Sequence, residues 1–409
     1  MSYNENKSVK AEEFRVSANN IKRCTRCALP VNWGITKLDD QGVCNHCHYY
    51  DTVQDKLRDF DRWKELFTNH LQQHKGKYEY DVAVGFSGGK DSSYILHALK
   101  KHYNCKVLAV TVSFGFMPTS FALENSKRVA KSLGIDHVIY DATSSQIYES
   151  FKNAVKRGRI CALCTGLCSA FTRKVAIERH IPFYVLGADR GQMFRSLAPE
   201  TAPVSGAHGI REMLTPYSNE KTLKNDNPRR VKQMHSWLGN FGLSEESRRE
   251  IYPIAEHLPG AHAVPLQLQF FLFHAYNEKK IKKVLEQEAN WQLPAKDHLH
   301  AHHDCTFHDA ATYFFRDAVG TTITNGEICV DVREGEISRA EAIQALGKED
   351  KRLDQLKQPY AVFEEYFGIP EKYLHQAAKQ FHRRMAVLKS LRKFQMLFSK
   401  PKLKTLDSL

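Results

Sequence analysis

The stretch DVAVGFSGGKDSS, residues 81–93, decides the fold of this chain. Its first part, Asp81 to Phe86, is apolar and partly β-branched, which predicts a buried strand. Ser87 to Ser92 follows as a glycine-containing turn, and Tyr94 to Lys100 continues as an amphipathic helix. The unpaired N–H groups and the dipole of a helix N-terminus favour an anion, and glycines let the backbone approach a phosphate closely. The stretch therefore predicts a phosphate-binding loop.

The spacing within this loop distinguishes it from other phosphate-binding loops. A Walker A loop has four residues between its first Gly and the Gly-Lys pair, and the dinucleotide fingerprint reads G-x-G-x-x-G, so neither fits. The string SGGKDS resembles the PP-loop of the ATP pyrophosphatases, which cleaves ATP between the α- and β-phosphates. The resemblance implies that ATP binds to the following residues: Ser87, Gly88, Gly89, Lys90, Asp91 and Ser92. Lys90 would stabilise charge on the departing pyrophosphate, and Asp91 is a candidate anchor for Mg²⁺.

The bulk properties favour a multidomain cytoplasmic protein with anionic partners. A length of 409 residues suits two or three domains, and no run of about 18 uncharged apolar residues indicates a membrane span. The N-terminal stretch MSYNENKSVKAEEF lacks the apolar segment of a signal peptide, so the ten cysteines are expected to be metal ligands or redox groups rather than disulfides. The net charge of +13 fits a nucleotide, tRNA, a sugar nucleotide or a membrane surface without choosing among them.

Further strands alternate with helices along the next hundred residues. Strands are expected at Lys106–Ser113, His137–Tyr140 and Ile181–Leu186, and helices at Thr119–Leu133 and Tyr148–Lys156. This alternation predicts an α/β fold with a doubly wound parallel sheet, of the PP-loop or HUP type. Ligands bind at the carboxyl ends of such strands, which adds Thr111, Gly187 and Asp189 to the predicted nucleotide site. Asp189 is expected either to hold Mg²⁺ or the ribose, or to cap the next helix.

Four cysteines near the N-terminus have the spacing of a zinc ribbon. Cys24-x2-Cys27 is followed after sixteen residues by Cys44-x2-Cys47, which is typical of a tetrahedral Zn²⁺ site. Four thiolates leave the ion no open position, so the site is predicted to be structural. His46 and His48 are surplus and are expected at the surface.

A second group of cysteines, Cys161-x2-Cys164-x3-Cys168, lies between two predicted strands. Cys161 and Cys164 are candidate catalytic residues that either ligate a metal or Fe–S cluster or carry persulfide chemistry on a low-pKa thiol. Apolar packing of the three cysteines is the alternative. Cys305, in the His-rich string HLHAHHDC, would complete an Fe–S site with Cys161 and Cys164 if the fold brings it close. Cys105 and Cys329 lie in strand-like apolar contexts and are predicted core residues.

These features divide the chain into four parts: a flexible N-terminus over 1–20, the zinc ribbon over 21–52, a PP-loop domain over 53–260 and a helical C-terminal region over 261–409. The PP-loop domain is expected to begin with a linker helix at Val53–His74 and to include a polar lid at Thr201–Asn240. Helices are further expected at Pro265–Leu285, Ser338–Leu346 and Tyr360–Phe381, before a basic tail from Lys379 to Lys404.

Most of the chain resembles the N-acetyl sugar amidotransferases of bacterial surface-polysaccharide synthesis, which are PP-loop ATP pyrophosphatases. The segments that carry the resemblance are RCTRCALP, GVCNHC, VAVGFSGGKDSS, Cys161-x2-Cys164-Thr-x-Gly, IPFYVLG, YNEKKIKKVLEQEANW and GEISRAEAIQAL. The family has a glutamate directly after the glycine that ends the late strand, whereas Leu186-Gly187-Ala188-Asp189 is closer to the turn of tRNA-thiolating relatives. This departure concerns the acceptor and not the ATP chemistry.

The leading hypothesis is an ATP-dependent amidotransferase. It would adenylate the acetamido carbonyl of a sugar nucleotide and replace its oxygen by ammonia, which the resemblance implies comes from a separate glutaminase. The alternative is a sulfurtransferase that thiolates tRNA or a small molecule through Cys161, Cys164 and Cys305. A third hypothesis is a non-catalytic zinc protein that binds nucleic acid. This hypothesis does not explain why the ATP loop is intact.

Overall fold

A five-stranded parallel sheet forms the centre of the protein. The computed structural model describes residues 21–196, 227–254, 265–293 and 304–398. The strands are β1 (Val82–Gly85), β2 (Val107–Ser113), β3 (Asp136–Asp141), β4 (Phe183–Leu186) and β5 (Leu266–Gln269). They pair in the order β3-β2-β1-β4-β5, and every pair is parallel. The phosphate-binding loop therefore leaves the sheet from its central strand, and the predicted doubly wound α/β fold is confirmed.

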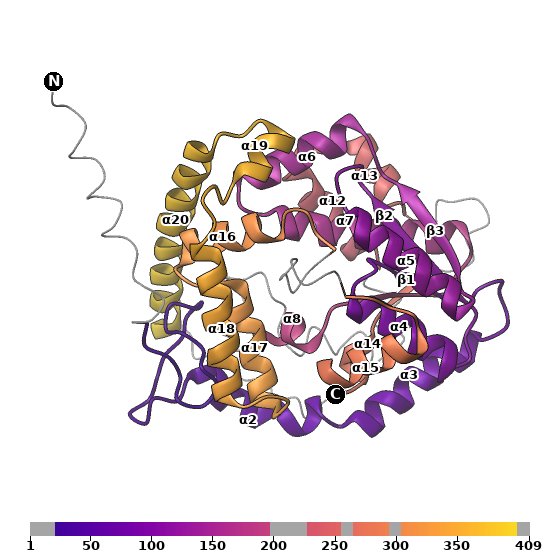
Figure 1. Cartoon of the computed structure of the whole chain (residues 1–409), viewed down its shortest axis with the longest axis horizontal. Coiled ribbons are helices and arrows are strands. Elements are labelled where there is room, and N and C mark those ends of the chain that lie inside the picture. Colours follow the sequence, from indigo (N-terminus) through magenta and orange to yellow (C-terminus); the bar gives the residue numbers. More distant parts are fainter. Residues whose placement is uncertain (1–20, 197–226, 255–264, 294–303, 399–409) are drawn as a thin grey trace.

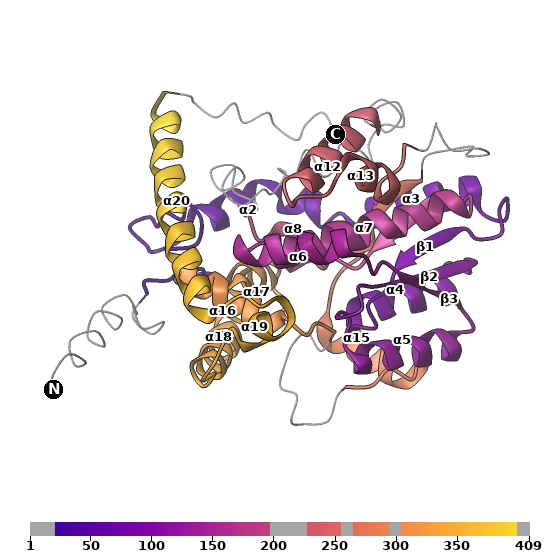
Figure 2. The same cartoon turned by 90° about the horizontal axis from the view of Figure 1, so that it is seen from above.

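Helices cover both faces of the sheet, because apolar side chains of the strands point to both faces. Val82 and Val84 belong to a core shared with α3 (Phe60–His74), α4 (Lys90–Lys101) and α5 (Ser120–Leu133). Ala83 points the other way, into a cluster with residues of α7 (Ile160–Glu178). Figure 2 shows the strands between α7 on one side and α4 and α5 on the other.

Several smaller helices extend these layers. On the α7 side lie α6 (Ser145–Lys156), α12 (Asn227–Gly239) and α13 (Glu245–Ile251), and on the α4 side lies α15 (Glu278–Glu288). The short helices α8 (Arg190–Phe194) and α14 (Phe270–Phe273) follow β4 and β5. Both strands thus lead directly from the sheet into a helix.

The C-terminal helices pack beside the sheet domain and against the N-terminal cysteine segment (Figure 1). They are α16 (His308–Val319), α17 (Ile323–Glu334), α18 (Arg339–Asp354), α19 (Ala361–Phe367) and α20 (Glu371–Phe398). Helix α17 joins the two parts. The buried guanidinium of Arg190 in α8 binds both carboxylate oxygens of Glu334, at 2.5 and 2.6 Å. Trp33 of the cysteine segment packs directly against Gly326 at the other face of α17.

Four predicted elements differ from the structure, and one of them is the helix expected at Tyr360–Phe381, which is the two helices α19 and α20 on either side of Gly368. The helix expected at Val53–His74 is two helices, α2 (Asn45–Leu57) and α3, because Asp59 caps a new start by accepting from Arg62 N at 3.3 Å. The helix expected at Pro265–Leu285 was wrong in its first half, where Leu266–Gln269 pairs with β4 as the edge strand. The lid expected at Thr201–Asn240 contains α12, and residues 201–226 lie outside the described residues.

One helix among the described residues, α7, is long and apolar enough to cross a membrane by length and composition. Most of it is buried inside the protein, against the sheet and α6. A core helix of this kind passes the same test, so the finding is weak evidence for a span.

Candidate active site and metal centre

The phosphate-binding loop is built around a glycine that admits no side chain. Gly88 has a φ of +80°, and a Cβ at this position would lie 2.3 Å from the carbonyl oxygen of Ala122 in α5. The Gly88 carbonyl accepts hydrogen bonds from Asn125 Nδ2 and Trp291 Nε1, both at 3.1 Å. The loop is therefore fixed between α4, α5 and the segment after α15.

The hydroxyls of the two loop serines accept hydrogen bonds from amides of the same loop and so hold its shape. Ser92 Oγ accepts from the Ser87 amide at 3.3 Å, and Ser87 Oγ accepts from the Gly89 amide at 3.2 Å. Gly89 is also the N-cap of α4, and no side chain caps the first turn of this helix. The first-turn amides therefore point toward a ligand position, as in an anion site.

The side chain of Lys90 lies among acidic groups and one aromatic ring. Its Nζ is 2.9 Å from Asp91 Oδ2 and 5.7 Å from the centre of the Tyr276 ring, and the Tyr276 hydroxyl donates to Asp91 Oδ1 at 3.1 Å. Burial by itself would lower the pKa of Lys90, but Asp91, Tyr276 and Glu278 together hold it well above its ordinary value. Lys90 is thus a permanently charged donor beside the loop.

Gly187 and Asp189 lie next to the loop, where the sequence placed them. A Cβ at Gly187 would be 3.4 Å from Ser92. Asp189 caps α8 by accepting from Gln192 N at 2.7 Å, which is the capping role considered for it. Burial, Asp91 and Glu327 raise the pKa of Asp189 to about 7, so this carboxyl is partly protonated at neutral pH. Its role toward a nucleotide stays a prediction.

Thr111 is placed less favourably for nucleotide binding. It is 1% exposed, and its hydroxyl donates to the Phe86 carbonyl at 2.7 Å and lies 2.8 Å from His137 Nε2. These contacts connect β1, β2 and β3. A role of its side chain in nucleotide binding stays a prediction that the contacts do not favour.

Cys161, Cys164 and Cys305 come together beside the loop. Cys161 is exposed and the other two are partly exposed, although Cys305 lies far from the α7 cysteines in sequence. Burial raises the pKa of Cys305, and Cys161, Cys164 and Asp304 raise it further because they lie close enough to interact electrostatically. The three thiols thus form one group, which we call the rim thiols.

The rim thiols do not have the lowered pKa that the persulfide hypothesis required. The protein atoms around the Cys161 thiol desolvate it and raise its pKa to about 12, although the residue as a whole is exposed and lies in the first turn of α7. A hydrogen bond with Cys168, followed by burial, raises the pKa of Cys164 well above its ordinary value. Thiols of this kind become thiolates when they bind a metal ion, so the raised pKa values speak against a free reactive thiol and are compatible with ligation.

Several residues of this region escaped the sequence reasoning. Asp304 reaches the loop, since its Oδ2 would lie 3.2 Å from a Cβ at Gly89. Arg195 pairs with Glu327 and is close enough to Cys161 to lower its pKa. Only Asp304 had any signal, its position next to Cys305. The histidines at 298, 300, 302 and 303 lie outside the described residues.

The four N-terminal cysteines form a separate and fully buried group. Their ligand atoms all lie within 4.8 Å of one another, with Sγ–Sγ distances of 3.9 Å for Cys24–Cys47 and 3.7 Å for Cys27–Cys44. A tetrahedral ion with metal–sulfur bonds of about 2.3 Å requires sulfurs about 3.8 Å apart. The group therefore fits a single tetrahedral metal ion, as the spacing predicted.

Two residues around this group are placed differently from the predictions. His46, expected at the surface, is fully buried, and burial lowers its pKa to about 3, so it stays neutral. Cys329, expected in a strand, lies in α17 next to Cys27. In the next turn Arg333 Nη2 donates to Cys27 Sγ at 3.5 Å. A buried cation beside four thiolates offsets part of their charge.

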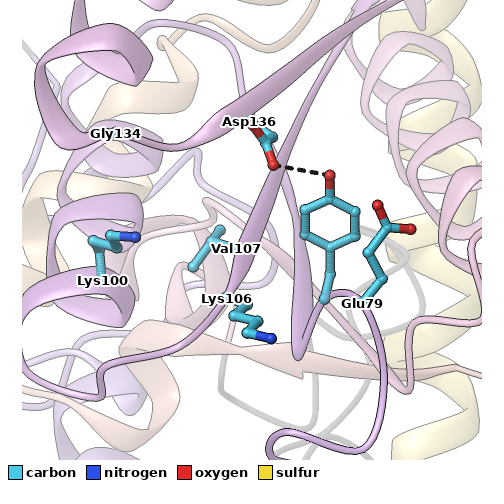
Figure 3. Close-up of a pocket in the computed structure, with 7 residues that line it drawn as sticks. Glu79, Lys100, Lys106, Val107, Gly134 and Asp136 are labelled. Atoms are coloured by element: carbon cyan, nitrogen blue, oxygen red, sulfur yellow. Dashed lines mark hydrogen bonds between the residues drawn. The ribbon is translucent and has the colours of Figure 1, made fainter.

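A shallow depression lies at the opposite edge of the sheet (Figure 3). It is lined by Glu79, Lys100, Lys106 and Asp136, and the Tyr80 hydroxyl donates to Asp136 at 2.9 Å. It lies at the start of β2 and β3, away from the phosphate-binding loop, and its mixed charges form no catalytic arrangement.

Three comparisons with known proteins found similarities, and the family match includes the loop. Residues 63–178 match the Asparagine synthase family model. The chain is 28% identical over 147 residues to the uncharacterized protein MJ1599 of Methanocaldococcus jannaschii, which is 35% of this chain, and it spans about half (51%) of that relative. A U34-tRNA thiolase, NcsA of Methanococcus maripaludis with its [4Fe-4S] cluster, aligns over 82% of this chain and 89% of its own, with 15% identity and a TM-score of 0.35. Residues 63–178 thus carry an ATP-utilising domain of the PP-loop ATP pyrophosphatase superfamily.

Proposed function

We propose that the protein is an AMP-forming sulfurtransferase that replaces a carbonyl oxygen of an acceptor by sulfur. ATP would bind with Mg²⁺ at Ser87–Ser92, and the rim thiols would hold an Fe–S cluster. A nucleobase of tRNA is the proposed acceptor, and the net charge of +13 is compatible with it.

The observation that supports this function is the position of the rim thiols. Asp304, which precedes Cys305, contacts the loop at Gly89, and its carboxylate also acts on the Cys164 thiol. Cys305 also interacts electrostatically with Cys161 and Cys164, so three cysteines from two distant segments gather next to Asp304, which reaches the loop. A structural role would not require partly exposed thiols at this point.

The first step would be adenylation of the acceptor. Its carbonyl oxygen attacks the α-phosphorus of ATP, and the bond to the bridging oxygen breaks, releasing pyrophosphate. Lys90 and the first-turn amides of α4 stabilise the charge that develops on pyrophosphate. Asp91 holds the Lys90 ammonium in place at 2.9 Å, so its orientation needs no rearrangement during the step.

The second step would exchange the activated oxygen for sulfur. Hydrosulfide forms the C–S bond with its own electron pair, the C–O bond breaks, and that pair leaves with AMP while the proton goes to solvent. No electrons are transferred overall. A bound Fe–S cluster would supply a position that holds sulfide near the acceptor. The protein's own contribution is the three thiols and the positive charge of Arg195 beside Cys161.

Anaerobic reconstitution with iron and sulfide tests this proposal. The wild-type protein should bind iron with a brown chromophore and, with ATP, sulfide and bulk tRNA, release AMP and form thiolated nucleosides detectable by mass spectrometry. Cys161→Ala, Cys164→Ala and Cys305→Ala should each lose iron and thiolation. Cys168→Ala is the matched control on the same helix and should keep both. Protein that binds no iron, or a Cys168→Ala variant that loses as much as the others, contradicts the assignment.

A second candidate keeps the ATP step and uses nitrogen. The match of residues 63–178 to a family named for asparagine synthesis supports it, since asparagine formation adds an amide nitrogen. Ammonia from a separate glutaminase would then convert the acetamido group of a sugar nucleotide to an acetamidino group. Iron-free protein that forms AMP with an acetamido sugar nucleotide and ammonia, but not with tRNA and sulfide, would favour this candidate.

For the N-terminal group the proposed ion is a structural Zn²⁺. Four thiolates at tetrahedral spacing leave no open ligand position, and all four cysteines are fully buried. Metal analysis of protein purified without added iron should give one zinc per chain. One iron per chain would contradict the assignment of zinc.

A further inference from the structure

Asp304 is held in place by its backbone and its neighbours. Its carbonyl accepts from the Thr119 amide at 3.4 Å, the Cys305 thiol lies 3.8 Å from Met117 Sδ, and the Thr306 hydroxyl donates to the Phe116 carbonyl at 3.3 Å. Residues 304–306 thus run along the segment between β2 and α5. The side chain of Asp304 takes no part in these contacts and is free for another purpose.

The carboxylate of Asp304 reaches over the phosphate-binding loop. A Cβ at Gly89 would lie 3.2 Å from Asp304 Oδ2 and 3.7 Å from its Cγ, so the second glycine of the loop is what admits the carboxylate. Among the residues that the structure describes, none donates a hydrogen bond to this carboxylate or forms an ion pair with it.

The other two carboxylates considered for Mg²⁺ are already engaged. Asp91 binds Lys90 and accepts from the Tyr276 hydroxyl, and Asp189 accepts from Gln192 N as a helix cap. Within the described part of the chain, Asp304 is therefore a carboxylate by the loop with neither oxygen in a hydrogen bond or ion pair, whereas Asp91 has both oxygens engaged and Asp189 has one.

A bare carboxylate at this point would repel the phosphates that the loop is built to bind. Lys90 offsets part of this repulsion, although its ammonium also pairs with Asp91 at 2.9 Å. A divalent cation between the Asp304 carboxylate and the phosphates turns this repulsion into attraction, because carboxylate and phosphate oxygens are the ligands that Mg²⁺ prefers. Ligation of the thiol-bound metal is less suitable for Asp304, since thiolate sites select soft metals and a carboxylate is a hard ligand.

We infer that Asp304 is a ligand of the divalent cation that accompanies the nucleotide. The cation would lie between the Asp304 carboxylate and the phosphates bound at Gly89. The inference rests on the proposed binding of ATP, but not on the identity of the acceptor or of the transferred atom.

Nucleotide binding with and without metal tests the inference directly. The probe is α,β-methylene ATP, measured by calorimetry in Mg²⁺ and in EDTA, with Mn²⁺ affinity in the nucleotide complex measured by EPR. Asp304→Asn should lower the Mn²⁺ affinity by about tenfold or more. It should also weaken nucleotide binding in Mg²⁺ and strengthen it in EDTA, because the repulsion is gone. Asp136→Asn, the same change at the far edge of the sheet, should alter none of these.

The outcomes separate this inference from the proposed function. Equal weakening of nucleotide binding in Mg²⁺ and EDTA, or unchanged Mn²⁺ affinity, overturns the role of Asp304. Loss of iron from Asp304→Asn with normal Mn²⁺ binding overturns it too and assigns the carboxylate to the thiol-bound metal. Wild-type protein that shows the metal-dependent binding but no thiolation refutes sulfur transfer and leaves Asp304 in place.

Discussion

The protein contains two groups of cysteines that look alike in sequence and differ in structure. Both include a Cys-x2-Cys pair. In the N-terminal group the four cysteines are fully buried, and their sulfurs lie at tetrahedral spacing. The rim thiols are partly exposed, come from two segments, and lie beside the phosphate-binding loop.

Both groups contain a Cys-x2-Cys pair, so this spacing does not distinguish a structural metal site from a proposed reactive site. The burial of the cysteines does. The N-terminal group is covered by α17, which supplies Cys329 and the guanidinium of Arg333. The rim thiols have Asp304 and Arg195 as charged neighbours, and these side chains also reach the loop or its surroundings. We expect changes in the first group to act on stability and changes in the second to act on chemistry.

The largest expected effect is on folding. Cys44→Ser removes a buried metal ligand and should lower the free energy of unfolding by on the order of 5 kcal/mol. Cys161→Ser, measured in iron-depleted protein, should change it by only about 0.5 kcal/mol because the side chain is exposed. Urea denaturation together with metal analysis measures both. Equal destabilisation by the two substitutions would abolish the distinction.

The next largest expected effect is on the rate of ATP turnover, in a variant that keeps the wild-type fold. Lys90→Ala should slow AMP formation by about 10²–10³-fold, since it removes a preorganised charge from the departing pyrophosphate. Lys100→Ala, in the last turn of the same helix, is the control and should keep the wild-type rate. Retention of full turnover by Lys90→Ala would count against adenylation at this loop.

A smaller effect is expected from the cation behind the N-terminal group. Arg333→Met removes the donor to Cys27 Sγ and should destabilise the metal-bound protein by about 1.5–3 kcal/mol. In metal-free protein the sign should reverse, because Nε and Nη1 of Arg333 are buried and have no hydrogen-bond partner among the residues that the structure describes. Thermal unfolding with and without a chelator measures this difference. Destabilisation of equal size in both states would mean that Arg333 serves packing alone.

The sequence predicted those features that short segments determine by themselves. The phosphate-binding loop and the paired N-terminal cysteines depend on residues a few positions apart, and both appear as expected.

The features that were missed depend on contacts between distant segments. Strand β5 is short and precedes a run of phenylalanines that suggests a helix, and only pairing with β4 makes it a strand. The burial of His46 is due to packing within the folded protein, and the approach of Asp304 to Gly89 depends on a second distant segment. Neither has a periodicity or a spacing that a single sequence could reveal.

The last expected effect is a pH dependence of stability that arises from a carboxyl beside the loop. The folded-state pKa of Asp189 is raised to about 7 by burial, Asp91 and Glu327, so folding favours its protonated form. The stability that this carboxyl contributes is fully present below its unfolded pKa of about 3.9 and is lost as the pH rises through about 7. Wild-type protein should therefore lose stability relative to Asp189→Asn between pH 5 and pH 8, in urea denaturation at each pH.

A neighbouring carboxyl makes this last measurement more specific. Burial and then Asp189 raise the pKa of Asp331 to about 8, so removing the Asp189 charge should lower the midpoint at which Asp331 ionises. The four N-terminal cysteines lie on the other face of α17, and zinc occupancy in Asp189→Asn should match the wild type throughout this range. A shift in zinc occupancy would mean that α17 transmits charge between the two cysteine regions, which would then no longer be independent.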